Sequence, residues 1–192
     1  MIKKLKFILI GFICFLRFFD PTLSGAKEYT ILEAQQVKFQ YHIGIFPFEG
    51  YFSLENSIFA INFENPSASK LRLKIDLNSS SAGFFLATIA MLGESVLYAE
   101  KYPYILFESK GVIVNDNNFK IIGDITIRGI SKEISISAKL KNPKILKVQD
   151  KKNLKFQIAA KLNRSDFNAV GYANVVGDVI DLNSSIDLIT GD

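Results

Sequence analysis

Residues Leu71-Arg72-Leu73-Lys74-Ile75-Asp76-Leu77 indicate the fold class, because apolar and polar side chains alternate along them without interruption. Successive side chains of a β-strand point to opposite faces of a sheet, so this pattern predicts a strand with one buried face and one wet face. The alternation returns in residues 134–140, 154–162 and 180–188. It is typical of antiparallel sheets that pack one face on a core.

Short groups of turn-favouring residues separate the predicted strands. They contain Gly, Pro, Asn or Asp, which adopt the backbone conformations of tight turns. The predicted turns lie at residues 44–50, 64–66, 115–118, 128–129, 142–143 and 151–153. Gly129 can supply the positive φ that a tight hairpin needs. Strands joined by short hairpins predict a meander that closes into a barrel or folds into a sandwich.

The periodicity changes between residues 82 and 99. There the spacing of apolar residues fits a helix better than a strand, which predicts one helix or two short ones, with Gly93 as a weak point. The residues that carry this spacing are Phe84, Phe85, Ala87, Thr88, Met91, Leu92 and Val96.

The first 26 residues have the organisation of a secretory signal peptide. Residues 1–6 are positively charged, residues 7–16 form an apolar run, and Ser24-Gly25-Ala26 places small side chains at a cleavage point. We therefore expect cleavage after Ala26 and a single mature domain of residues 27–192. An uncleaved anchor or a buried first helix is the alternative, but the apolar run covers only about half a bilayer.

The formal charge of +4 does not indicate a nucleic-acid partner. Lys3, Lys4, Lys6 and Arg17 against Asp20 contribute +3 of it, so the predicted mature chain carries only +1. The basic balance therefore says nothing about partners, and no nucleic-acid partner is expected.

The composition also limits the chemistry. The only cysteine, Cys14, lies in the predicted signal peptide, and His42 is the only histidine, so thiol catalysis and multi-histidine metal sites are excluded from the mature chain. A triad would have to combine His42 with residues such as Ser165 and Asp166, without a Gly-x-Ser-x-Gly turn. We expect a binding protein with no enzymatic activity, metal or cofactor, and His42 at a barrel rim.

Four segments, in order, resemble those of one family. They are residues 42–70 with HIG, GYF and NPSASK, residues 102–109 (YPYILFES), residues 123–132 (GDITIRGISK) and residues 164–167 (RSDF). Together they resemble the YceI-like family of periplasmic polyisoprenoid-binding proteins, from about Tyr29 to Leu188. The resemblance implies an all-β fold, an extended eight-stranded antiparallel lipocalin-like barrel with one short helical segment, located in the periplasm.

The resemblance also implies a ligand, a polyisoprenoid of the quinone or prenyl phosphate type or a similar long apolar chain, held in the lumen of a carrier or reservoir. Apolar residues on the inward faces of the strands are the candidate ligand contacts. They are Phe39, Tyr41, Phe52, Leu73, Ile75, Ile105, Phe107, Ile125, Ile127, Ile136, Phe156 and Ile158. The uncharged stretch 83–93 adds Phe84, Phe85, Met91 and Leu92 as a lid or membrane-touching portal.

Alternatives to these expectations stay open. The many aromatic side chains could fill the barrel, which would favour an interaction or stress-associated protein without a lipid ligand. A hydrolase or isomerase would need His42 in a cleft beside a carboxylate or hydroxyl. The helical stretch could simply pack on the barrel. Transient membrane contact is expected of a carrier, and the oligomeric state is open, a dimer included.

Overall fold

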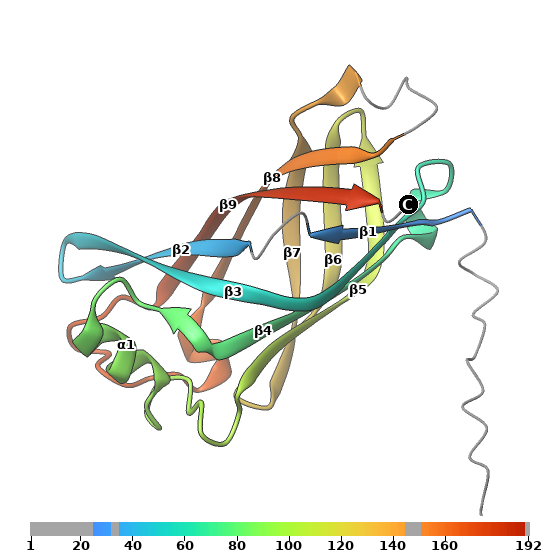
Figure 1. Ribbon diagram of the computed structural model, residues 1–192. Coiled ribbons are helices and arrows are strands. Elements are labelled where there is room, and N and C mark those ends of the chain that lie inside the picture. Colours follow the sequence, from blue (N-terminus) through green and yellow to red (C-terminus); the bar gives the residue numbers. More distant parts are fainter. Residues whose placement is uncertain (1–24, 32–34, 145–150, 191–192) are drawn as a thin grey trace, which may run out of the picture.

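The computed structural model describes residues 25–31, 35–144 and 151–190. The predicted signal peptide lies outside this part, except for Gly25 and Ala26. The described strands form one closed antiparallel barrel (Figure 1). They are β1 (Lys27–Ile31), β2 (Gln36–Ile43), β3 (Phe46–Ile61), β4 (Lys70–Ser81), β5 (Tyr104–Asn115), β6 (Asn118–Ile127), β7 (Ile130–Leu140), β8 (Asn153–Asn163) and β9 (Val179–Thr190). The helical elements are the α-helix α1 (Phe85–Leu92) and two short 3-10 helices, η2 (Pro66–Ala68) and η4 (Arg164–Phe167).

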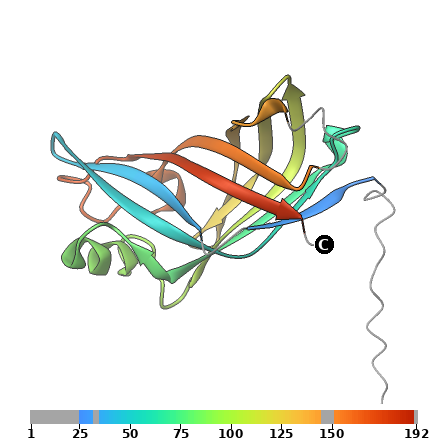
Figure 2. The same ribbon diagram turned by 45° about the horizontal axis from the view of Figure 1, so that its top comes forward.

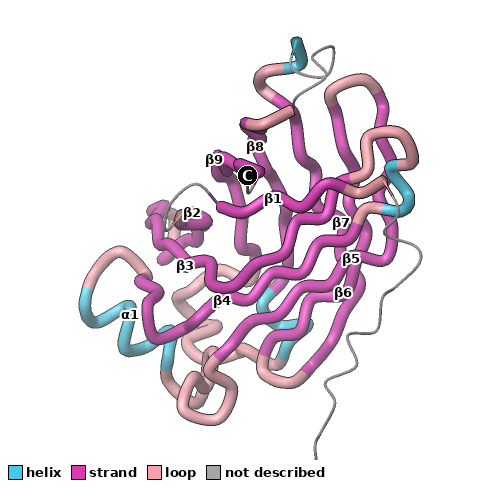
Figure 3. The backbone as a smooth tube through the Cα atoms, turned by 45° about the vertical axis from the view of Figure 1, so that its right-hand side comes forward, coloured by secondary structure: helices cyan, strands magenta, loops and turns pink. Residues whose placement is uncertain are grey.

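Nine strands occupy eight positions around the barrel. β1 pairs with β3 and β9 near one end, and β2 pairs with the same two strands near the other end, so β1 and β2 share one position. The remaining strands follow in chain order, and pairing of β3 with β4 closes the circle (Figure 3). The prediction of an eight-stranded antiparallel barrel with one short helix is confirmed, with one of its positions divided between two strands.

The hairpin between β6 and β7 has the predicted geometry. Arg128 and Gly129 form its two-residue turn with φ values of 52° and 73°. Positive φ at both positions matches the twist of the flanking strands, and glycine adopts it without steric cost.

The turn predicted at residues 44–50 is shorter than expected. Only Gly44 and Ile45 form it, and β3 begins at Phe46. Gly50 lies within β3 opposite Phe39, where an added Cβ would lie 2.3 Å from the Phe39 ring. This glycine therefore makes room for an inward aromatic side chain and does not form a turn.

The two ends of the barrel differ. At one end, here called the α1 end, α1, the β2–β3 hairpin and the η4–β9 connection gather, while the described termini lie at the opposite, terminal end (Figures 1 and 2). Aromatic side chains narrow the terminal end, where the rings of Phe119 and Phe156 meet edge to face at 5.2 Å. None of the described helices is long and apolar enough to cross a membrane.

Candidate ligand-binding cavity

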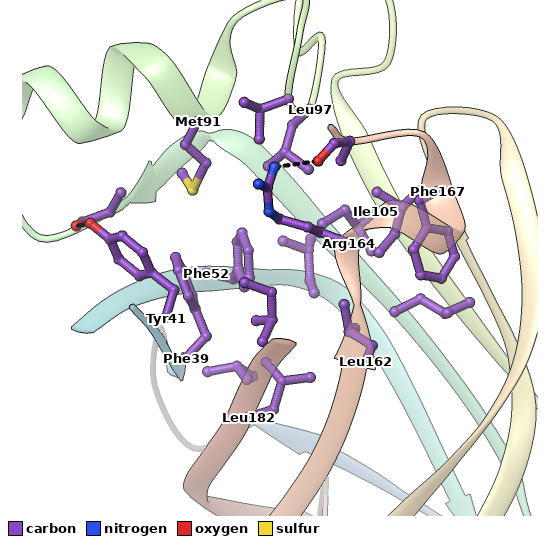
Figure 4. Close-up of a pocket in the computed structure, with 18 of the residues that line it drawn as sticks. Phe39, Tyr41, Phe52, Met91, Leu97, Ile105, Leu162, Arg164, Phe167 and Leu182 are labelled. Atoms are coloured by element: carbon purple, nitrogen blue, oxygen red, sulfur yellow. Dashed lines mark hydrogen bonds between the residues drawn. The ribbon is translucent and has the colours of Figure 1, made fainter. Parts of the chain in front are cut away.

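A cavity of about 380 Å³ occupies the α1 end of the barrel. Inward side chains of β2 to β9 line its wall, and residues of α1 and of the η4–β9 connection line its outer part (Figure 4). The volume lies within the range of roughly 300–1,000 Å³ that is typical of small-molecule sites. The alternation that predicted the strands thus places a continuous apolar surface inside the barrel.

Stacked aromatic rings form the β2–β3 side of the cavity wall. Phe39 and Phe52 face each other across the two strands, with ring centroids 4.4 Å apart, and Tyr41 lies beside Phe39 at 6.0 Å. The Tyr41 hydroxyl donates a 2.9 Å hydrogen bond to the carbonyl oxygen of Ala82. Burial raises the pKa of Tyr41 above its ordinary value. With its hydroxyl bound to the backbone, this tyrosine contributes an apolar ring to the wall.

Arg164 is the only charged residue in the lining of this cavity, as far as the described residues define it. Its guanidinium is buried and donates hydrogen bonds to backbone carbonyls of the η4–β9 connection (Figure 4). The acceptors are Gly177 (3.0 Å), Val176 (2.9 Å), Gly171 (2.7 Å) and Ala169. Burial lowers the pKa of Arg164, and the negative charge of Asp178 opposes that shift. The guanidinium therefore holds this connection in place at the cavity.

The helix α1 covers part of the cavity opening, yet its own residues are not buried. Ala87, Ala90 and Met91 line the cavity, whereas Phe85 and Ile89 on another face of the helix are 76% and 54% exposed. In Figure 4 the Met91 side chain points from the helix into the cavity. None of the eight helical residues is buried, although no charged residue occurs among them.

The helix is fastened to the barrel through Thr88. The Thr88 hydroxyl oxygen accepts a 3.0 Å hydrogen bond from the backbone N–H of Ala82, which directly follows β4, and donates a 3.0 Å bond to the carbonyl of Phe84. On the far side, Arg128 donates to the carbonyls of Glu94 and Val96. The helical segment is thus tied to the residue that follows β4 and to the β6–β7 turn.

The structure brings together thirteen of the sixteen predicted ligand contacts. The residues that line the cavity are Phe39, Tyr41, Phe52, Leu73, Ile75, Phe84, Met91, Ile105, Phe107, Ile125, Ile127, Ile136 and Ile158. Three lie elsewhere: Phe85 on the exposed face of α1, Leu92 packed against the core, and Phe156 at the terminal end. Phe84 is the extended residue before α1 and lines the cavity, whereas Phe85 begins the helix and is exposed.

Sequence reasoning missed a second group of lining residues, which come from β8, β9 and their connection. Leu162, Ile180 and Leu182 belong to alternating segments, so their inward direction was open to prediction. Arg164 and Phe167 were recognised only as part of a family motif. Val176 and its neighbours carry no periodic signal, because an irregular connection has no repeating face.

His42 lies half-buried near the end of β2, at the rim of the barrel, as expected. It pairs with Pro47 in the ladder, and its backbone carbonyl accepts a 2.9 Å hydrogen bond from Gly177. Within the described chain, no three His, Cys, Asp or Glu side chains are grouped so that they could hold a metal ion.

A closed antiparallel barrel with an apolar cavity at one end defines a lipocalin-like class of protein. The chain belongs to the YceI-like domain family, whose family model matches residues 29–188. The predicted family membership is therefore confirmed.

Curated relatives match over a shorter segment. UPF0312 proteins of Yersinia pestis and Pseudomonas aeruginosa are 29% and 30% identical over 99 residues, which make up 52% of this chain and 52% of each relative. The match thus spans about half the length of these relatives.

Solved structures share the fold. BcnA of Burkholderia cenocepacia matches with a TM-score of 0.67 at 18% identity, covering 83% of this chain and 100% of that one. The YCEI protein of Campylobacter jejuni matches with a TM-score of 0.64 at 25% identity over 79% and 90% of the two chains. A polyisoprenoid-binding domain of Saccharophagus degradans, implicated in plant cell wall breakdown, matches with a TM-score of 0.62 at 12% identity, over 85% and 98%.

Proposed function

We propose that this protein is a periplasmic carrier or reservoir that holds a polyisoprenoid, of the quinone or prenyl phosphate type, or a similar long apolar chain in its cavity. The observation that carries the proposal is the apolar cavity of about 380 Å³ inside the barrel. Removing apolar surface from water contributes about 25 cal/mol per Å², so a chain enclosed in such a cavity gains several kcal/mol before the costs of ordering it.

Two further observations support an apolar ligand. The similar domain of Saccharophagus degradans is described as polyisoprenoid-binding. Among the described lining residues the one charged group, Arg164, already donates to four backbone carbonyls. The cavity therefore suits the tail of a lipid, and its polar head group would remain at the α1 end.

A binding role fits the cavity better than catalysis does. Catalytic acid–base chemistry needs a titratable group within reach of the reacting atoms. The described lining offers only Arg164, which is occupied, and the hydroxyls of Tyr41 and Tyr172. A barrel filled by side chains would leave no room for a lipid, and the cavity of about 380 Å³ argues against that alternative.

The carrier role includes contact of the α1 end with a membrane. Large apolar side chains are exposed around the cavity there, on three separate elements. They are Ile45, Phe46, Phe84, Phe85, Leu86, Ile89, Val170, Tyr172 and Val175, called the apolar rim below. An uncharged helix with apolar residues on all sides is normally buried or inserted in a membrane interface. A bilayer would cover α1 and bring the cavity next to its lipids.

The ligand proposal is tested by expressing the full chain in a bacterium, purifying the protein without detergent, and extracting it with organic solvent. Mass spectrometry of the extract should find a prenyl lipid at near one molecule per protein. An extract without any lipid, from protein that also binds no added polyprenol, would overturn the proposal.

Membrane contact is tested by cosedimentation with vesicles of phosphatidylethanolamine and phosphatidylglycerol. The double variant Phe85→Gln/Ile89→Gln should reduce the bound fraction at least tenfold. Ile113→Gln is the matched control, because Ile113 is 57% exposed in β5, away from α1. Equal binding of all three proteins would contradict membrane contact through α1. A rim-dependent dimer in solution would show instead that a second copy covers the rim.

A further inference from the structure

A second, much smaller cavity lies inside the same barrel, toward the terminal end. Its volume is about 50 Å³, and it is surrounded by apolar side chains of β3 to β9 together with Ser69. The Phe119 and Phe156 rings belong to its wall. The barrel interior is therefore divided into two compartments along its length.

Ile158 lies at the division between the two compartments. It is the only residue that lines both cavities, within the part of the chain that the structure describes. On the neighbouring strand β7, Ile136 lines the larger cavity and Ala138 the smaller one. On β4 the same change occurs between Leu73 and Leu71. The partition thus crosses the barrel at one level and includes the Ile158 side chain.

We propose that Ile158 forms the blind end of the ligand cavity and limits the length of prenyl chain that the protein can enclose. This inference rests on the proposed lipid-binding function. A chain that enters from the α1 end buries successive isoprene units until its tip reaches Ile158. Units beyond that number stay outside the barrel and gain no burial. Affinity should therefore rise with chain length up to a limit and then stay constant.

Ile158 limits the ligand because the space behind it, the small compartment, could hold more of the chain if the partition were removed. It is apolar apart from Ser69, whose hydroxyl oxygen accepts a 3.0 Å hydrogen bond from the backbone N–H of Asn62. Apolar cavities of this kind stay empty of water and accept apolar guests. A shorter side chain at position 158 would join the compartments into one longer cavity.

The test measures the affinity of the full-length protein, freed of lipid, for geraniol, farnesol, geranylgeraniol and a longer polyprenol. For the wild type, each added isoprene unit below the limit should raise affinity about tenfold or more, and units above it should change affinity less than about twofold. Ile158→Ala should move the limit to a longer prenol and raise the affinity for that prenol about tenfold. Ile158→Val is a milder change that preserves more of the core. It should raise the affinity for the longer prenol as well, but by a smaller factor.

Ile180→Ala is the matched control, because Ile180 lines only the larger cavity. It removes the same atoms from the wall and should weaken binding of every prenol by a similar factor, with the limit unchanged. An affinity that keeps rising through the longest prenol, or a limit that stays in place in both Ile158 variants, would overturn the partition while leaving lipid binding intact. A wild-type protein that binds none of the prenols would overturn the proposed function itself, and this inference with it.

Discussion

The Nε atom of Arg164 donates a 3.0 Å hydrogen bond to the carbonyl oxygen of Gly177, across the connection between β8 and β9. The rest of the guanidinium binds three further carbonyls of the same connection. A planar group with five donors can satisfy several acceptors at once, which a lysine ammonium at this position could not reach in the same geometry. The connection that borders the cavity is thus organised around a single side chain.

Replacing this side chain tests its structural role. Arg164→Met keeps an apolar stem but leaves four backbone carbonyls without their donor, so it should lower the free energy of unfolding by about 3 kcal/mol. Amide hydrogen exchange should accelerate in residues 168–178 more than in β5 and β6. Arg164→Lys should recover little of the loss. Unchanged stability of Arg164→Met in urea denaturation would contradict the anchoring role.

The buried Tyr41 hydroxyl should affect stability in two pH ranges. Tyr41→Phe removes the bond to Ala82 and leaves a buried carbonyl unpaired, which should cost about 1–2 kcal/mol at neutral pH. Burial raises the pKa of Tyr41 in the folded protein above 10.0. Above that pH the unfolded chain loses the phenol proton while the folded chain retains it, so wild-type stability falls as the pH rises.

The loss of stability at alkaline pH can be measured directly. Urea denaturation at neutral pH and above pH 10 should show a smaller alkaline loss for Tyr41→Phe than for the wild type. Equal losses in the two proteins would mean that other groups cause the alkaline destabilisation.

Filling the cavity from α1 should exclude the ligand. Ala87 is half-buried and lines the cavity, so the Ala87→Trp side chain would occupy ligand space, and we expect at least a tenfold fall in bound lipid. Ile89→Trp is the control, because Ile89 lies on the exposed face of the same helix. Extraction and mass spectrometry of both variants give the comparison, and equal lipid content would place the ligand outside this cavity.

The β6–β7 hairpin should be sensitive to a single methyl group. Gly129 has a φ of 73°, and an added Cβ would lie 2.9 Å from the Tyr102 ring, so Gly129→Ala should cost about 1–2 kcal/mol. Gly111→Ala is the control, since its Cβ would meet no atom within 4 Å and its φ is not positive. Thermal unfolding of both variants measures the difference, and equal midpoints would be inconsistent with strain at Gly129.

The strands can be predicted from the sequence alone, because the side chains of a strand alternate strictly and one buried face leaves a period of two in the sequence. Alternation in residues 71–77, 134–140, 154–162 and 180–188 marks segments that are strands in the structure. The same alternation indicates which strand residues point inward, and eleven of the twelve strand residues predicted as ligand contacts line the cavity. The hairpin at Arg128 and Gly129 followed from local turn chemistry.

How the inward residues are distributed along the barrel depends on the tertiary structure. Phe107 and Phe156 are equivalent in the sequence pattern, yet the first lines the large cavity and the second the small one. Their difference depends on strand register and on their level along the barrel axis, which arise from pairings between distant parts of the chain. Irregular segments gave no periodic signal either, so the place of Arg164 beside the cavity and the exposure of Phe85 became visible only once the barrel was closed.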